Sequence, residues 1–147
     1  MIGQQQPIEN DLAMKITSTD ACLCGSGLIY KNCCQILHKG GKAASPEALM
    51  RSRYSAYALG LAAYIMQTTH PEGTQYRADQ AAWKRDIDLF CQNTRFARLQ
   101  ILAARDDMVT FRATLFANNL DVSFTEISVF RQHNGRWKYY SGAQLEH

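Results

Sequence analysis

The chain has 147 residues, of which 46% are hydrophobic, and its formal net charge is +3. A chain of this length can bury a hydrophobic core without help from metals or disulfides, and the composition fits one compact domain with a small appendage. The weak charge, without a long basic run, neither requires nor excludes a nucleic-acid partner, and no stretch resembles a signal peptide or a membrane span.

The two ends of the chain are predicted to lie outside the fold. Residues 1–19 are polar and aperiodic and are expected to form a flexible leader. Residues 145–147 resemble the remnant of a histidine-tag linker. Without an export signal or a span, we expect a cytoplasmic protein with no membrane partner, in a compartment that disfavours disulfides.

Residues 22–34, CLCGSGLIYKNCC, hold four of the five cysteines. Four thiolates complete the tetrahedron that zinc prefers, so this spacing predicts a Zn²⁺ ion and a structural site without an open position. Gly25 and Gly27 would let the chain turn tightly, and a short helical turn at residues 30–31 would deliver the second pair. The predicted ligands are Cys22, Cys24, Cys33 and Cys34.

The four cysteines have two alternatives to a metal site. Disulfides are disfavoured in a reducing compartment. Four inert buried thiols are disfavoured because the segment has few other apolar residues with which to form a core. Zinc is therefore the preferred interpretation.

The same residues, C-x-C-G-S-G-x-x-Y-K-x-C-C, resemble the SEC-C zinc motif, with Leu23 where proline is usual. The motif occurs at the C-terminus of the bacterial secretion ATPase SecA, where it docks a partner chaperone. The resemblance implies a SEC-C zinc knuckle at residues 20–40 and a protein partner that binds through it.

Three helices are expected after the knuckle. Ser45, followed by proline and glutamate, is typical of a helix start, and Gly60 is expected to end that helix. A second helix follows and ends near His70-Pro71. The third carries Trp83 and, on the same apolar stripe, the fifth cysteine, Cys91, which we interpret as a small core residue.

After Thr94 the hydrophobic period changes to two, which indicates strands. Alternating residues predict strands around 97–103, 109–115 and 122–130, with turns at 106–107 and 118–119. Asn134-Gly135 is a strong type I′ hairpin signal before the last strand. The pattern predicts an α+β fold with three helices packed on one face of a four-stranded antiparallel sheet.

This segment resembles the YchJ family, notably in Leu49–Ala56, His70-Pro71, Glu126-x-Ser128-x-Phe130 and the ending around Trp137–Gly142. The resemblance covers nearly all of residues 20–142. It implies a nuclear transport factor 2-like cone at residues 45–143, in which a curved sheet wraps around helices and encloses a pocket. The resemblance implies this fold rather than a function.

Arg53 and Glu126 each interrupt an otherwise apolar stripe. An isolated buried charge is costly, so each is expected to be the salt-bridge partner of the other. The preferred interpretation is a structural ion pair, and the alternative is a role in ligand binding.

Four other polar or aromatic residues are candidates for a role in the cone. His70 is expected to cap a helix or lie on the surface, Arg51 to be a solvated charge, and Tyr54 and Trp83 to be core aromatics. Convergence at the mouth of the cone would instead form a small-molecule pocket. The candidate pocket residues are Arg53, Tyr54, His70, Trp83 and Glu126.

The sequence is compatible with three classes of function. The leading hypothesis is a zinc-binding adaptor that recognises a protein through the knuckle. The alternative is a small-molecule binder or enzyme, with Glu126 or His70 as base and Arg53 as anion anchor, but no nucleophile–base pair at telling spacing favours catalysis. Nucleic-acid binding is disfavoured because no ladder of aromatic and basic residues accompanies the lysines near the knuckle.

Overall fold

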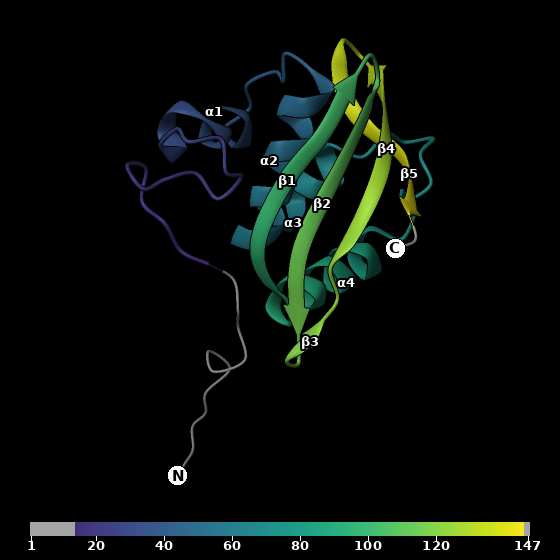
Figure 1. Ribbon diagram of the computed structural model, residues 1–147. Helices are drawn as coiled ribbons and strands as arrows, with labels where there is room; N and C mark the ends of the chain where they lie inside the picture. The colour runs from purple at the N-terminus through teal and green to yellow at the C-terminus, as the bar shows by residue number, and fades with distance from the viewer. Residues whose placement is uncertain (1–13, 146–147) are drawn as a thin grey trace.

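The computed structural model describes residues 14–145, in which a curved antiparallel sheet carries helices on one face (Figure 1). The sheet order is β1-β2-β4-β5, and the short β3 pairs with β2. The α+β prediction is confirmed, with β3 as an additional strand. The bounds are β1 Arg95–Arg105, β2 Met108–Ala117, β3 Leu120–Asp121, β4 Phe124–His133 and β5 Arg136–Leu145.

The hairpin turns follow from residues that tolerate positive φ. Asn134 and Gly135 have φ values of 53° and 77°, which a type I′ turn requires at both central positions. Asp106, Asn118 and Asn119 also have positive φ, at the turns before β2 and β3. These are residue types that enter the left-handed region at low cost, and all three predicted turns are confirmed.

The sheet curves because its ladders contain irregularities. The β1–β2 register shifts between Phe96 and Arg98 and again between Ile101 and Ala103, and the β4–β5 register shifts after Val129. A bulge bends its strand and increases the local twist. The concave face that results packs against the longest helix, α2 (Pro46–Leu59).

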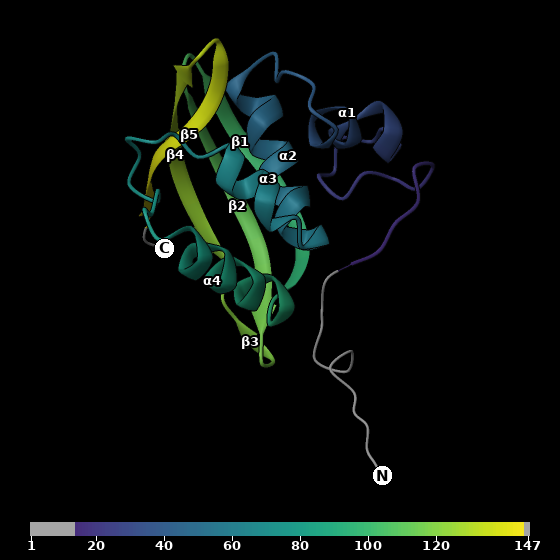
Figure 2. The same ribbon diagram turned by 180° about the vertical axis from the view of Figure 1, so that it is seen from behind.

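Three helices cover that face: α2 (Pro46–Leu59), α3 (Ala62–Gln67) and α4 (Gln80–Gln92) (Figure 2). The Ser45 side chain accepts a hydrogen bond from Ala48 N, and Gly60 ends α2 with a φ of 75°. Both predicted caps are therefore present. No helix within residues 14–145 is long and apolar enough to cross a membrane.

The buried side chains form two clusters. The larger joins α2 to the sheet and also includes three cysteines of the knuckle. The smaller lies among α2, α3 and α4 and contains Trp83 and Cys91, so both are core residues as expected. The knuckle and the cone therefore share a hydrophobic core.

The knuckle contains two short helices, η2 (Tyr30–Asn32) and α1 (Cys34–His38), beside α2 (Figure 1). Of the predicted leader, residues 14–19 are described and contact the rest of the chain. Met14 N donates to Ala58 O, and Lys31 N donates to Ser18 O, both at 2.9 Å. Leu145 is the last residue of β5; the other residues of both predicted terminal segments lie outside the described range.

Candidate functional site

The first two cysteines lie at the start of a small loop. Ala21 and Ile29 form an isolated antiparallel bridge that closes this loop. Inside it, Gly25 and Gly27 have φ values of 79° and 91°, a conformation that side-chain-bearing residues rarely adopt. The glycines thus allow the turn that directs residues 22–24 toward the second pair.

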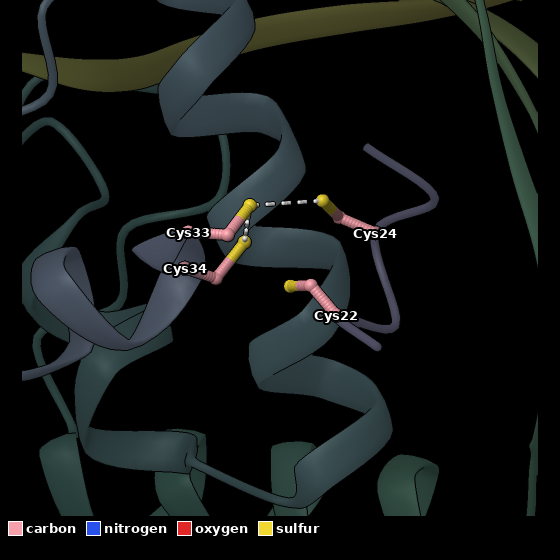
Figure 3. Close-up of side chains that lie close together, drawn as sticks. All are labelled: Cys22, Cys24, Cys33 and Cys34. Atoms are coloured by element: carbon pink, nitrogen blue, oxygen red, sulfur yellow. Dashed lines mark hydrogen bonds between the residues drawn. The ribbon is translucent and has the colours of Figure 1, made fainter. Parts of the chain in front are cut away.

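The second pair follows the one-turn helix η2, as predicted. Cys33 is the residue between η2 and α1, and Cys34 is the first residue of α1. Adjacent cysteines at this helix junction place both sulfur atoms opposite the loop (Figure 3).

All four Sγ atoms lie within 4.8 Å of one another. Cys24 Sγ is 3.6 Å from Cys33 Sγ, which is 4.0 Å from Cys34 Sγ (Figure 3). A tetrahedron with metal–sulfur bonds of about 2.3 Å has sulfur–sulfur edges of about 3.8 Å. The cluster has dimensions suited to one metal ion, and none of these thiols is in a disulfide.

Polar side chains lie beside two of the sulfur atoms, where a thiolate would carry negative charge. Arg51 Nη1 donates to Cys24 O at 2.9 Å and lies 4.0 Å from Cys24 Sγ, while Arg51 Nε pairs with Glu47 at 3.0 Å. Ser26 Oγ lies 3.1 Å from Cys33 Sγ. The expectation that Arg51 is a solvated charge is wrong, because its guanidinium is oriented by Glu47 onto the loop.

The thiols influence one another's pKa values. Hydrogen bonds with Cys22 and Cys34 hold the pKa of Cys24 well below its usual range. The hydrogen bond with Cys24, with a contribution from burial, raises the pKa of Cys22 to about 11, and hydrogen bonds with Cys22 and Cys24 raise the pKa of Cys34. The pKa values therefore favour the thiolate at Cys24 over Cys22 and Cys34, and binding of a cation would favour loss of the protons that Cys22 and Cys34 retain.

A half-buried histidine, His38, joins the knuckle to α2. His38 Nε2 lies 2.8 Å from the carbonyl oxygen of Ser52, so this nitrogen is the donor. In the neutral ring Nδ1 then accepts from the Tyr30 hydroxyl, 2.7 Å away. Desolvation lowers the pKa of His38, which favours this neutral form. Sequence reasoning missed His38, although its position four residues after Cys34 was a usable signal.

A second candidate site is a cavity of about 280 Å³ inside the cone. It includes three of the five predicted pocket residues, namely Arg53, Tyr54 and Glu126. Its wall is mostly aromatic and aliphatic, with polar side chains from α2, β4 and β5. The other lining residues are Met50, Tyr57, Gln75, Phe90, Phe96, Phe111, Ala113, Leu115, Phe124, Ser128, Tyr139 and Gln144.

The predicted ion pair between Arg53 and Glu126 is wrong. None of the ion pairs among residues 14–145 includes either side chain. Arg53 Nη1 instead donates to oxygen atoms at the end of α3, the nearest being Thr68 Oγ1 at 2.7 Å. Glu126 Oε2 accepts from Ser128 and from Tyr139. Each charge is therefore stabilised by neutral hydrogen-bonding groups rather than by the other charge.

The other two predicted pocket residues lie elsewhere. His70 is only 7% exposed, so the expected surface position is wrong; its Nδ1 accepts from Glu72 N, and its ring packs against His133 and Tyr140. Trp83 is 5% exposed and packs in the smaller core cluster.

Two segments of the chain match known protein families. The model of the YchJ middle NTF2-like domain matches residues 45–142, and the SEC-C motif matches residues 19–36. The chain belongs to the YchJ family. A curated relative, a UPF0225 protein from Deinococcus radiodurans, is 38% identical over 84% of this chain and 88% of its own. A UPF0225 protein from Pectobacterium carotovorum is 33% identical over 87% and 86%.

Two solved structures are also similar to this YchJ family member. A SEC-C motif containing protein from Rhodopseudomonas palustris aligns with a TM-score of 0.71 and 35% identity, over 85% of this chain and 98% of its own. A second, from Psychrobacter arcticus, aligns with a TM-score of 0.58 and 25% identity, over 88% and 82%. The combination of a cysteine motif and a cone is thus shared by these proteins.

Proposed function

We propose that the four clustered cysteines bind one structural Zn²⁺ ion and that the resulting knuckle, residues 20–40, binds another protein. The observation that carries this proposal is the mutual approach of four Sγ atoms within 4.8 Å. Zinc is borderline-soft and accepts a tetrahedron of thiolates. Four protein ligands leave no position for substrate, which supports a structural role and an adaptor function rather than catalysis.

The surface of the knuckle supports the adaptor role. Leu28 and Ile36 are 52% and 54% exposed, one in the loop and one on α1. Lys31 and Lys39 are exposed on the same segment. Large apolar side chains with charged neighbours are typical of a surface that buries apolar area against a partner. The chemistry fits a partner with apolar side chains and an acidic rim, and the cone at residues 45–143 would act as the rigid support.

The test combines metal analysis with partner capture. We expect wild-type protein, purified under reducing conditions, to contain one zinc per chain by native mass spectrometry. Cys33→Ser should lose the metal, because three thiolates bind zinc more weakly, whereas Cys91→Ser should keep it because Cys91 lies in the smaller core cluster. A reduced wild-type chain with four reactive thiols and no metal would contradict the zinc site.

Partner binding is tested with surface variants that leave the ligands intact. We expect Leu28→Asp and Ile36→Asp to retain zinc but lose the bacterial protein that wild type captures at stoichiometric amounts. Leu102→Asp and Leu120→Asp serve as matched controls, since these residues are 55% and 66% exposed outside the knuckle. Equal capture by all four variants would place the interaction elsewhere and refute the adaptor role of the knuckle.

A further inference from the structure

The cavity of the cone has a deep apolar wall and an open polar rim. Its volume of about 280 Å³ is near the lower end of the range of small-molecule sites, about 300–1,000 Å³. Phe96 and Phe111 are buried in its wall, while Gln75 and Gln144 are exposed and mark the opening. These dimensions suit a ligand with a single ring or a branched hydrocarbon body.

Arg53 provides a buried cation at this cavity. Its side chain is 3% exposed and its guanidinium lies over the Tyr139 ring, 4.8 Å from the centroid. The three hydrogen bonds to the end of α3 all come from Nη1 and go to neutral oxygen atoms. The remaining guanidinium N–H groups are available to the Tyr57 hydroxyl and to a ligand. Among residues 14–145, no carboxylate lies within salt-bridge distance of this cation.

Glu126 provides an anion in the same cavity, and side chains of the neighbouring sheet residues hold its carboxylate in place. Oε2 accepts hydrogen bonds from Ser128 Oγ and from the Tyr139 hydroxyl, the latter at 3.1 Å. A Cβ atom at Gly142 would collide with both Glu126 Oε2 and the Tyr139 hydroxyl. Within the described chain both hydrogen bonds of this carboxylate go to Oε2, which leaves Oε1 for a ligand.

The charges of the cavity limit what it can bind. Arg53 and Glu126 are the charged residues of its lining, so together they sum to zero. An anionic ligand would pair with Arg53 but be repelled by Glu126. A cationic ligand would pair with Glu126 but be repelled by Arg53. A ligand whose head group carries both an anionic acceptor and a cationic donor can pair with Arg53 and Glu126 at the same time. Its hydrocarbon body would contact the aromatic wall.

We propose that this cavity binds a small zwitterionic molecule of the hydrophobic α-amino acid class. Its carboxylate pairs with the free N–H groups of Arg53, its ammonium group with Oε1 of Glu126, and its side chain with Phe96 and Phe111. The proposal is independent of the zinc knuckle, because none of the cavity residues belongs to residues 20–40.

The test compares three probes that share a phenyl ring and differ in the head group. L-Phenylalanine carries both charges, 3-phenylpropionate only the anion, and 2-phenylethylamine only the cation. Titration of wild-type protein by calorimetry should give phenylalanine at least about a ten-fold tighter Kd than either single-charge probe, as expected for a lost charge-assisted hydrogen bond. No binding of phenylalanine, or tighter binding of a single-charge probe, would overturn the proposal.

Two variants locate the binding. Glu126→Gln keeps the size of the side chain and should reduce the preference for phenylalanine over phenylpropionate to about two-fold or less. Ala113→Leu fills the cavity and should abolish binding, whereas Ala103→Leu, on an exposed position of β1, should not. Unchanged probe preference in Glu126→Gln would overturn the proposal. The comparison of probes on wild type decides the question even if Ala113→Leu does not fold.

Discussion

Gly142 shows at the scale of one residue how a small side chain determines a neighbour's position. It pairs with Ser128 in the β4–β5 ladder and lies diagonally across from Glu126. The space that a Cβ atom would need is taken by Glu126 Oε2 and the Tyr139 hydroxyl. The constraint is steric rather than conformational, because Gly142 is not among the residues with positive φ.

Gly142→Ala should therefore lower the free energy of unfolding by about 1–3 kcal/mol, the usual cost of overpacking. Urea denaturation measures this change. In a Glu126→Ala background the same substitution should cost much less, since one colliding group is gone. Ser141→Ala, the neighbouring position in β5, is the control and should change stability by less than about 0.5 kcal/mol. Equal costs of Gly142→Ala in both backgrounds would contradict the steric account.

The knuckle and α2 show at the scale of elements how polar contacts dock one segment on another. His38 on α1 bridges Tyr30 of η2 and the backbone of Ser52 on α2. The ring also packs edge-on against Tyr64, with centroids 4.7 Å apart. This arrangement needs neutral imidazole, since Nδ1 accepts while Nε2 donates.

The docking should therefore depend on pH. Burial lowers the pKa of folded His38 below its ordinary value of 6.5, so the unfolded chain binds the proton more readily. The stabilisation from His38 is complete above pH 6.5 and is lost as pH falls from there through the lowered pKa. Melting temperatures between pH 7.5 and 5.5 should fall more for wild type than for His38→Gln. Parallel decreases in the two proteins would show that His38 does not titrate in this range.

At the scale of the whole molecule, two sequence units share a core. Cys22, Cys24 and Cys34 belong to the same buried cluster as Leu49 of α2 and Phe111 of β2. The smaller cluster among the helices contains no knuckle residue. Loss of order in the knuckle would thus uncover part of the cone's core but leave the sheet ladders and the second cluster intact.

Chelation of the proposed zinc should unfold the knuckle and weaken the cone without unfolding it. Metal binding supplies folding free energy to a segment of this size, and the cone keeps a core of its own. Hydrogen exchange after chelator treatment should rise at residues 20–38 and stay slow in β2 and β4, while the melting temperature decreases. Chelated Cys91→Ser should behave like wild type. Simultaneous exchange of the whole chain, or none at all in the knuckle, would contradict this picture.

The sequence by itself determined the local features of this protein. The spacing of Cys22 and Cys34 indicated a metal cluster, Ser45 and Gly60 bounded α2, and Asn134-Gly135 indicated the last hairpin. Each of these depends on residues close in sequence, where backbone geometry leaves few alternatives. The change of hydrophobic period from the helical spacing to two, after Thr94, then sufficed to predict the α+β fold. The two-residue β3 is too short to show a period.

The tertiary structure alone decided which polar groups meet. The sequence showed that Arg53 and Glu126 interrupt apolar stripes, but the choice of partners depends on distances between elements far apart in the chain. Arg53 donates to the oxygen atoms that end α3, and Glu126 accepts from the Tyr139 hydroxyl, so the two line one cavity without forming an ion pair. The same reason explains Arg51, whose contact with the cysteine loop exists only because the knuckle packs on α2. Burial can be inferred from a pattern, but a hydrogen-bond partner is fixed by packing.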